Sequence, residues 1–268
     1  MLHICHRVGK LSVRISIVRS EKIGISGVLF LERSEGRRLK AHMSNPMKSL
    51  TKIEWGVWIG SLLIIILSNV LSVSFDLLTL IASCIGVTSL IFAAKGNVWS
   101  QILMIIFSIL YGTISWQFRY WGEMITYLGM TFPMAVWSTI TWIRNPSASG
   151  KEVEIQTLTI KHVCMLILSA VIVTAVFFQI LAALNTPNII FSTISVTTSF
   201  FAASLTMLRS SYYAVGYAAN DIVLIVLWGL AALKDSRYIS VIVIFVIFFF
   251  YDLYGFVSWK QRERKLCG

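Results

Sequence analysis

From about residue 53 onward, apolar residues form runs of about 20 that are separated by charged and turn-forming residues. A helix of roughly 20 residues crosses a hydrocarbon core of about 30 Å, and in lipid a helix satisfies its own backbone hydrogen bonds. The pattern therefore predicts a transmembrane domain over residues 53–260. Its eight predicted helices lie at about residues 55–73, 75–94, 98–117, 121–143, 163–184, 189–208, 213–232 and 239–259.

A shift of 117 residues superposes two groups of three predicted helices without a gap. It places Tyr111 on Trp228 and Trp142 on Trp259. We predict two repeats, at about 75–143 and 189–259, joined by a linker helix at 163–184. Because one helix separates them, both repeats enter the membrane from the same side, as in parallel-repeat transporters. The expected fold class is an all-α polytopic membrane protein with a 3+1+3 arrangement, preceded by one extra N-terminal transmembrane helix.

Composition and charge agree with this pattern. The 268 residues are 57% hydrophobic and 13% charged, with a mean hydropathy of +0.78, which excludes an ordinary soluble domain. The net charge of +11 does not indicate nucleic-acid binding, because eleven of the 23 Lys and Arg residues fall in the first 52 positions. With both termini in the cytoplasm, twenty cations lie inside and three outside, as the positive-inside rule expects for a plasma (inner) membrane protein.

The terminal segments carry little chemistry. Residues 1–52 form a basic cytoplasmic tail without the features of a signal peptide, and Met43 is an alternative start. The cluster His3, Cys5 and His6 lacks further ligands at zinc-site spacing, so we predict no metal site. The four cysteines are scattered and predict no disulfide framework. Residues 261–268 are a second short cytoplasmic tail.

Two polar residues stand in the middle of the apolar run at 213–232, namely Asn220 and Asp221. A carboxylate inside a membrane costs at least a few kcal/mol and normally faces protein or a watery cavity, where it marks a functional site. The alternative is a polar clamp between packed helices.

Enzyme motifs are absent from the sequence, which contains no HExxH, GxSxG or GxxxxGK[ST]. We therefore predict neither an enzyme nor a cofactor site, and no ATP-driven pump. A channel would need a continuous polar pore, for which one or two polar residues per helix are too few. A scaffold, the remaining alternative, would tolerate apolar replacement of the polar residues within the helices.

Four segments carry a family resemblance. They are "LIASCIGVTSLIFAAKGNVWSQILMIIFSILYGTISW" (80–116), "YWGEMITYLGMTFPMAVWSTITWIRNP" (120–146), "LTMLRSSYYAVGYAANDIVLIVLW" (205–228) and "FFYDLYGFVSWKQRER" (249–264). Over about residues 50–265 the chain resembles the PnuC-type nicotinamide riboside transporters, of the SWEET-like superfamily. The resemblance implies facilitated uptake of an NAD precursor by alternating access, and it allows a homotrimer. Relatives of the family carry thiamine or riboflavin, so these vitamins are alternative substrates.

Nicotinamide riboside would bring a cationic ring, a carboxamide and ribose hydroxyls to the site. Aromatic faces attract such a cation by about 0.5–2 kcal/mol, and buried donors need partners. Asp221 and Trp228 are seven positions apart and share a helical face, whereas Asn220 is turned by about 100° from Asp221. We expect the polar pair to hold the ribose or carboxamide while an aromatic ring stacks on the pyridinium.

Further candidates for substrate contact lie on three other helices. Asp252 shares a face with Gly255 and Trp259 and is expected to sense the cationic ring, although an interfacial carboxylate is an alternative. Gln101 is expected to bind a carboxamide, with an interhelical clamp as the alternative. The aromatic candidates are Tyr111, Trp116 and Tyr254.

Two residues of the run at 121–143 are candidates for a gate or hinge. Glu123 lies near its outer end, where the alternatives are a hydrated carboxylate or a helix cap. Pro133 lacks a backbone donor and is predicted to kink the helix. A hinge between two bundles is one use of such a kink, and a static kink accommodated by packing is the other.

Overall fold

The computed structural model describes residues 45–72 and 75–267. Most of the predicted basic tail, including His3, Cys5, His6 and Met43, lies outside these residues. The named elements of the described residues are all helices, which confirms the predicted class, and the connector at residues 145–159 adds one isolated β-bridge between Pro146 and Val153. Its long helices are α3 (Lys52–Val70), α4 (Leu77–Ala94), α5 (Trp99–Gln117), α8 (Ile160–Ala183), α9 (Ile189–Met207), α10 (Tyr213–Ala232) and α11 (Ile239–Cys267).

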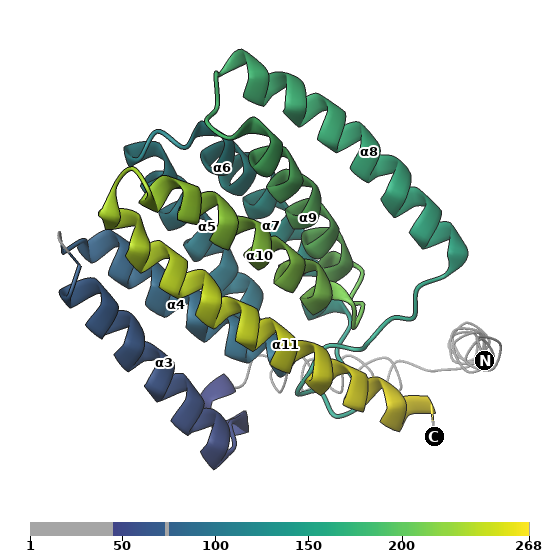
Figure 1. Ribbon diagram of the computed structural model, residues 1–268. Helices are drawn as coiled ribbons and strands as arrows, with labels where there is room; N and C mark the ends of the chain where they lie inside the picture. The colour runs from purple at the N-terminus through teal and green to yellow at the C-terminus, as the bar shows by residue number, and fades with distance from the viewer. Residues whose placement is uncertain (1–44, 73–74, 268) are drawn as a thin grey trace, which may run out of the picture.

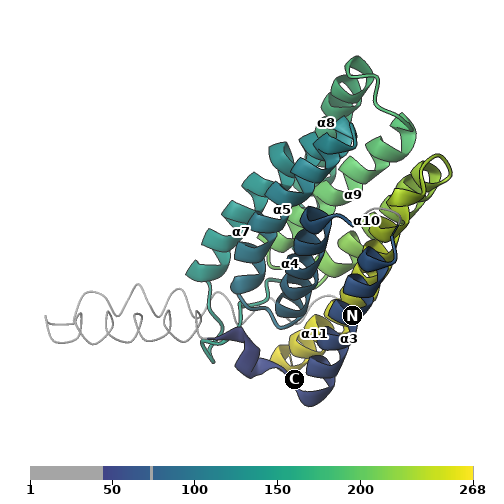
Figure 2. The ribbon, with the colours of Figure 1, turned by 90° about the vertical axis from the view of Figure 1, so that its left-hand side faces the viewer.

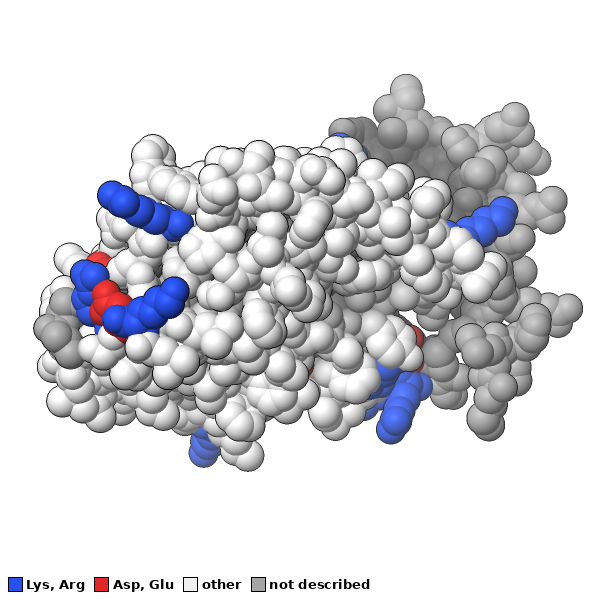
Figure 3. Space-filling model, turned by 45° about the horizontal axis from the view of Figure 1, so that its top comes forward, with Lys and Arg blue, Asp and Glu red and all other residues white. Residues whose placement is uncertain are grey.

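Seven helices of the described residues are long and apolar enough to cross a membrane. The eighth predicted crossing is a broken rod, made of α6 (Trp121–Ile125), a π-helical turn η3 (Thr126–Thr131) and α7 (Phe132–Arg144). The start of α3 and the end of α11 lie at one end of the bundle (Figure 2). On the face seen in Figure 3, charged side chains gather mostly at the two ends, and a broad band between them is uncharged. Such a band is what a hydrocarbon core requires.

Local sequence signals explain where the helices begin. Thr51 and Glu54 form a reciprocal capping box at the start of α3, and the side chain of Asp76 caps α4 through the backbone N–H of Leu78. These side chains satisfy amide donors that have no partner within the helix. At the other end of α4, Gly96 takes a φ of +68° and turns the chain toward α5, a conformation that suits glycine.

The two repeats are interlocked rather than side by side. One consists of α4, α5 and the α6–α7 rod, the other of α9, α10 and α11, and α8 lies on the outside against α9 (Figure 1). The third helix of each repeat packs on the first helix of the other, so α11 lies on α4 and α7 on α9. Helix α3 lies on the opposite side of the bundle from α8, against α4 and α11 (Figure 1).

Two tryptophans related by the 117-residue shift stabilise this packing of each third helix on the other repeat. The indole N–H of Trp259 donates to the carbonyl of Ala93 at 2.8 Å, and that of Trp142 donates to the carbonyl of Thr206 at 3.0 Å. Each bond thus joins the third helix of one repeat to the end of the first helix of the other. The two rings also touch, with centroids 5.6 Å apart. Residues that the repeat makes equivalent therefore meet near the axis between the repeats.

A π-helical turn lies just before Pro133, where we predicted a kink. Within η3 the backbone N–H of Phe132 donates to the carbonyl of Tyr127, five residues back. Pro133 follows at the start of α7 and has no N–H to give the carbonyl of Gly129. A π turn of this kind widens the helix and often marks a functional position. It brings Tyr127 and Thr131 toward the centre of the bundle, where both are buried.

Candidate functional site

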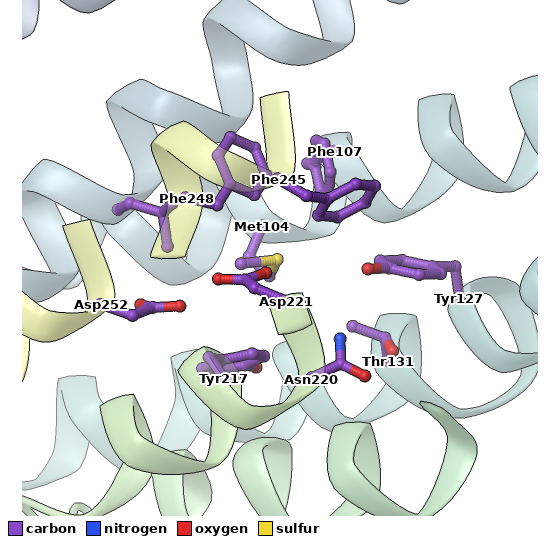
Figure 4. A pocket seen from close by; sticks show the side chains of 11 residues that line it. Met104, Phe107, Tyr127, Thr131, Tyr217, Asn220, Asp221, Phe245, Phe248 and Asp252 are labelled. Atoms are coloured by element: carbon purple, nitrogen blue, oxygen red, sulfur yellow. The ribbon is translucent and has the colours of Figure 1, made fainter. Parts of the chain in front are cut away.

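The polar residues of α10 and α11 line a small cavity between the two repeats (Figure 4). Its volume is about 20 Å³, room for little more than a water molecule. Helices α4, α5 and the turn η3 supply one wall, and α10 and α11 supply the other. The lining residues are Leu90, Met104, Phe107, Tyr127, Thr131, Tyr217, Asn220, Asp221, Phe245, Phe248 and Asp252.

Asp221 and Asp252 face one another across this cavity (Figure 4). Their carboxyl groups lie within hydrogen-bonding reach of each other. The residues are only 4% and 3% exposed, and Oδ2 of Asp221 has no hydrogen-bond partner among the residues that the structure describes. The structure thus places Asp252 in the interior, and the alternative of an interfacial carboxylate is wrong.

Asn220 forms the polar clamp between helices that was the alternative to substrate binding, and it also lines the cavity. Its Oδ1 accepts hydrogen bonds from Thr198 and Ser199, both at 2.9 Å, and from Ser195 at 3.4 Å. These three hydroxyls belong to α9, so the carbonyl half of the amide is an interhelical clamp. The amide nitrogen points the other way, into the cavity (Figure 4). A fixed donor therefore stands beside the two carboxyl groups.

Aromatic side chains form much of the remaining wall. Tyr127 reaches the cavity from η3, and Tyr217 reaches it from α10, one turn before Asp221 (Figure 4). The phenyl rings of Phe107, Phe245 and Phe248 lie around them. Such faces attract cations, most strongly where water is excluded. The site therefore combines acidic groups, one amide donor and several aromatic rings, which suits a flat cationic ligand with polar substituents.

Tyr111 and Trp228 lie one layer behind this cavity. The indole N–H of Trp228 donates to the hydroxyl of Tyr111 at 2.7 Å, and the Tyr111 ring packs on Tyr127 with centroids 4.3 Å apart. On the other side, Trp228 contacts the rings of Tyr120 and Tyr238. Neither residue lines the cavity in this closed form, where both rings support its wall and close the bundle toward the α5–α6 loop, so a contact of Tyr111 or Trp228 with the ligand stays a prediction.

Three further predicted residues do not reach the cavity. Trp116 is 61% exposed and Tyr254 39% exposed, because both lie on outward faces of their helices. The Tyr254 hydroxyl donates to Glu54 of α3. Gln101 is buried, but its amide donates to the hydroxyl of Ser100 at 3.2 Å and does not line the cavity. Since helical faces in lipid are apolar on both sides, sequence alone did not separate inward from outward rings.

Glu123 is neither exposed to water nor a cap of its helix, so both alternatives to a gating role are wrong. It is fully buried, and neither of its carboxylate oxygens has a hydrogen-bond partner in the described chain. Gly122 beside it packs closely on Leu181 near the end of α8 and on Thr186 in the loop that follows α8. Glu123 lies outside the lining of the cavity, one turn before Tyr127, so a gating role between the cavity and the α5–α6 loop stays a prediction.

Several lining residues were not among the sequence candidates. Spacing was a usable signal for three of them, because Tyr217 precedes Asp221 by four residues, and Phe248 and Phe245 precede Asp252 by four and seven. Tyr127, Thr131, Met104 and Phe107 come from the other repeat. Only the packing of the repeats brings them to the same cavity.

A larger hollow lies between α3 and α11, with a volume of about 350 Å³. Its walls include Ile53, Val57, Ile64 and Phe250, all exposed on the outside of the bundle. Its acidic residue, Glu54, is already neutralised by Lys95 at 2.7 Å. Because this groove opens outward and is apolar, it does not compete with the interior cavity as the site for a polar cation.

Comparison with known proteins places this architecture in a family. The family model described as "Nicotinamide mononucleotide transporter" matches residues 76–261. The chain belongs to this family. The match spans both repeats and the linker helix, and so includes every residue that lines the cavity.

Individual relatives agree with the assignment. The nicotinamide riboside transporter PnuC of Neisseria mucosa is 22% identical over 193 residues, which are 70% of this chain and 73% of the relative. PnuC of Haemophilus influenzae is 22% identical over 190 residues, 70% of this chain and 81% of the relative. A crystal structure of the vitamin B3 transporter PnuC superposes with a TM-score of 0.70 at 22% identity, covering 79% of this chain and 92% of that one. The transporter thus shares the PnuC fold and is a multi-pass inner-membrane protein.

Proposed function

We propose that this chain transports nicotinamide riboside across the inner membrane, by alternating access and without ATP. Two relatives are named as nicotinamide riboside transporters. The observation that carries the proposal is the interior cavity, where two buried carboxyl groups, one amide donor and several aromatic rings meet between the repeats. Substrate sites near the midplane between repeats are a transporter feature.

The ligand matches the cavity group by group. Its pyridinium ring carries a fixed positive charge, which the carboxyl groups of Asp221 and Asp252 compensate and the rings of Tyr127 and Tyr217 face. Its carboxamide and ribose hydroxyls need buried partners. The amide nitrogen of Asn220 supplies a donor held in place by α9.

The small volume of the cavity indicates that the structure is a closed form of the transporter. About 20 Å³ does not hold a nucleoside, so binding requires the repeats to separate around the site. The π turn η3 lies in the wall and its Tyr127 and Thr131 line the cavity. A helix with an interrupted hydrogen-bond ladder bends there more easily than elsewhere, and we assign the hinge to η3 and Pro133.

The charge of the site also indicates which of the alternative substrates would bind better. Thiamine carries a fixed positive ring charge, whereas riboflavin is neutral, so the carboxyl pair favours thiamine as the second candidate. A scaffold protein has no use for an unpaired buried carboxylate, which is costly to fold around. The proposal includes cytoplasmic termini, because among the Lys and Arg residues of the described chain only Arg119, Lys234 and Arg237 lie in loops at the opposite end of the helices. It also includes a homotrimer, which size measurement of the purified protein tests.

Uptake into proteoliposomes tests the proposed function directly. Radiolabelled nicotinamide riboside is expected to enter liposomes that contain the protein, at equal pH on both sides and without ATP. Excess thiamine is expected to compete weakly, and excess riboflavin not at all, because the site selects a cation. Liposomes without protein give the background. Uptake of thiamine or riboflavin but not of nicotinamide riboside would replace the substrate, and no uptake of any of them would reject the transporter assignment.

Replacing Pro133 tests the hinge. In Pro133→Ala the new N–H can bond to the carbonyl of Gly129, which favours a regular α-helix by up to about 3 kcal/mol. We expect a higher thermal unfolding midpoint and a several-fold lower maximal uptake rate, with the binding affinity little changed. Pro187→Ala, in the loop between α8 and α9, is the matched control. An unchanged uptake rate in Pro133→Ala would favour a static kink.

A further inference from the structure

The two carboxyl groups of the cavity lack a counter-charge. Asp221 of α10 and Asp252 of α11 face one another within hydrogen-bonding reach and are almost completely buried. No Lys, Arg or His is among the residues that line the cavity. Two carboxylates this close cannot both be ionised, and even one buried negative charge is costly without a partner.

The neighbouring helices supply no cationic side chain that could compensate a negative charge on Asp221 or Asp252. Tyrosines are the titratable groups that face the pair, with Tyr127 from η3 and Tyr217 from α10 at the cavity. Tyr213 of α10 lies near Asp252, and Glu123 of α6 lies near Tyr127. Helices α4 and α5 contribute Leu90, Met104 and Phe107, and α9 faces Asn220 with hydroxyls.

The first two cations that follow Asp252 on α11 are engaged elsewhere. Lys260 pairs with Glu263 at 2.7 Å. The guanidinium of Arg262 bonds to Glu152 at 2.7 Å and to the carbonyls of Ala94 and Lys95 at 3.0 Å each. It lies ten residues beyond Asp252, toward the end of α11. The empty site is therefore uncharged only when both carboxyl groups carry a proton.

We infer that Asp221 and Asp252 form a proton-binding site, and that the cationic substrate and a proton occupy it alternately. The inference rests on the proposed function. In the balanced step, the substrate cation binds to the doubly protonated pair and one O–H bond breaks. The proton leaves to water, and the remaining proton is shared between the two carboxyl groups. The loaded site then holds one carboxylate charge and one cation, so it is uncharged in both states.

Electroneutrality gives the exchange a consequence for transport. Neither the empty nor the loaded form carries a net charge at the site through the low-dielectric core. With equal pH on both sides, substrate moves down its own gradient as proposed above. A pH difference adds to that gradient or opposes it, because each substrate that enters returns one proton.

Calorimetric titration of the full-length purified protein tests the exchange. Binding heats for nicotinamide riboside are measured in two buffers of different ionisation enthalpy, which gives the number of protons released. The reduced form, which has the same substituents but an uncharged dihydropyridine ring, is the matched ligand. We expect about one proton released by the cation and none by the reduced form. The affinity for the cation is then expected to rise about tenfold per pH unit, over the range in which the protein stays folded, while that for the reduced form stays constant.

Two variants test which carboxyl groups release the proton. In Asp221→Asn/Asp252→Asn we expect the reduced form to bind with the same affinity as in the wild-type protein. Binding of the cation is expected to release no proton, and the cation is no longer expected to bind more tightly than the reduced form at high pH. In Glu123→Gln, which alters the other unpartnered buried carboxyl of the described chain, we expect the release to persist. Binding of the cation without release, equal release by both ligands, or loss of release in Glu123→Gln would each overturn the inference while leaving transport intact. Absence of binding by either ligand would instead contradict the proposed function.

Discussion

Replacing both carboxyl groups of the cavity by leucine is expected to abolish transport while leaving the fold as stable as before or more so. In Asp221→Leu/Asp252→Leu two buried acids become apolar groups of similar size, and such replacements are often neutral or stabilising. Substrate recognition loses two hydrogen-bonding groups, one of them charged in the loaded site. At about 1.5–3 kcal/mol for each bond to a charged group, the affinity for nicotinamide riboside is expected to fall by more than about 100-fold.

The readouts are substrate binding, uptake into proteoliposomes and the thermal unfolding midpoint of the purified variant. Asp235→Leu is the control, since Asp235 is a surface residue paired with Arg237 in the α10–α11 turn. We expect its uptake to stay within about twofold of the wild-type value. A double variant that still transports would show that the carboxyl pair is not the substrate site. One that unfolds would show that the pair is structural, which is the scaffold interpretation.

The second large effect is on stability, and it concerns the bond between the repeats. Trp259 is fully buried, its indole N–H bonds to Ala93 of α4, and its ring contacts Trp142 and Tyr213. In Trp259→Ala the ring is lost and a backbone carbonyl is left without its side-chain donor. Large-to-small changes of this kind cost about 3–5 kcal/mol, so we expect a markedly lower unfolding midpoint and a reduced yield of folded protein.

Trp116→Ala is the matched control for this experiment. Trp116 lies in the same bundle but is 61% exposed on the outside of α5. Its removal leaves the repeat contacts intact, and we expect the unfolding midpoint in detergent to change little. Equal destabilisation by the two variants would mean that burial in the bundle does not set the stability, and that the exchange of third helices between repeats is not what holds it together.

The sequence by itself determined the helical class and the order of the apolar segments along the chain. Runs of about 20 apolar residues have one stable form in lipid, because every backbone donor and acceptor must be satisfied within the segment. The offset of 117 residues also identified pairs that meet in space, namely Tyr111 with Trp228 and Trp142 with Trp259. Asp221 stood out because an acid is rarely tolerated inside an apolar run, and the structure places it in the cavity.

What only the tertiary structure decided is which face of each helix looks inward. In a soluble protein, polarity marks the exposed face. In a membrane, lipid and core are both apolar, so the sequence around Trp116 and Tyr254 resembles that around the buried Trp228, although Trp116 and Tyr254 lie on the outside.

Contacts between helices decided the positions of the buried acids. The interior position of Glu123 depends on how α6 packs near α8, and the pairing of Asp221 with Asp252 depends on how α10 packs on α11. The π turn before Pro133 widens the helix and brings Tyr127 to the cavity wall. These features depend on contacts between distant segments, and no periodicity within a single helix encodes them.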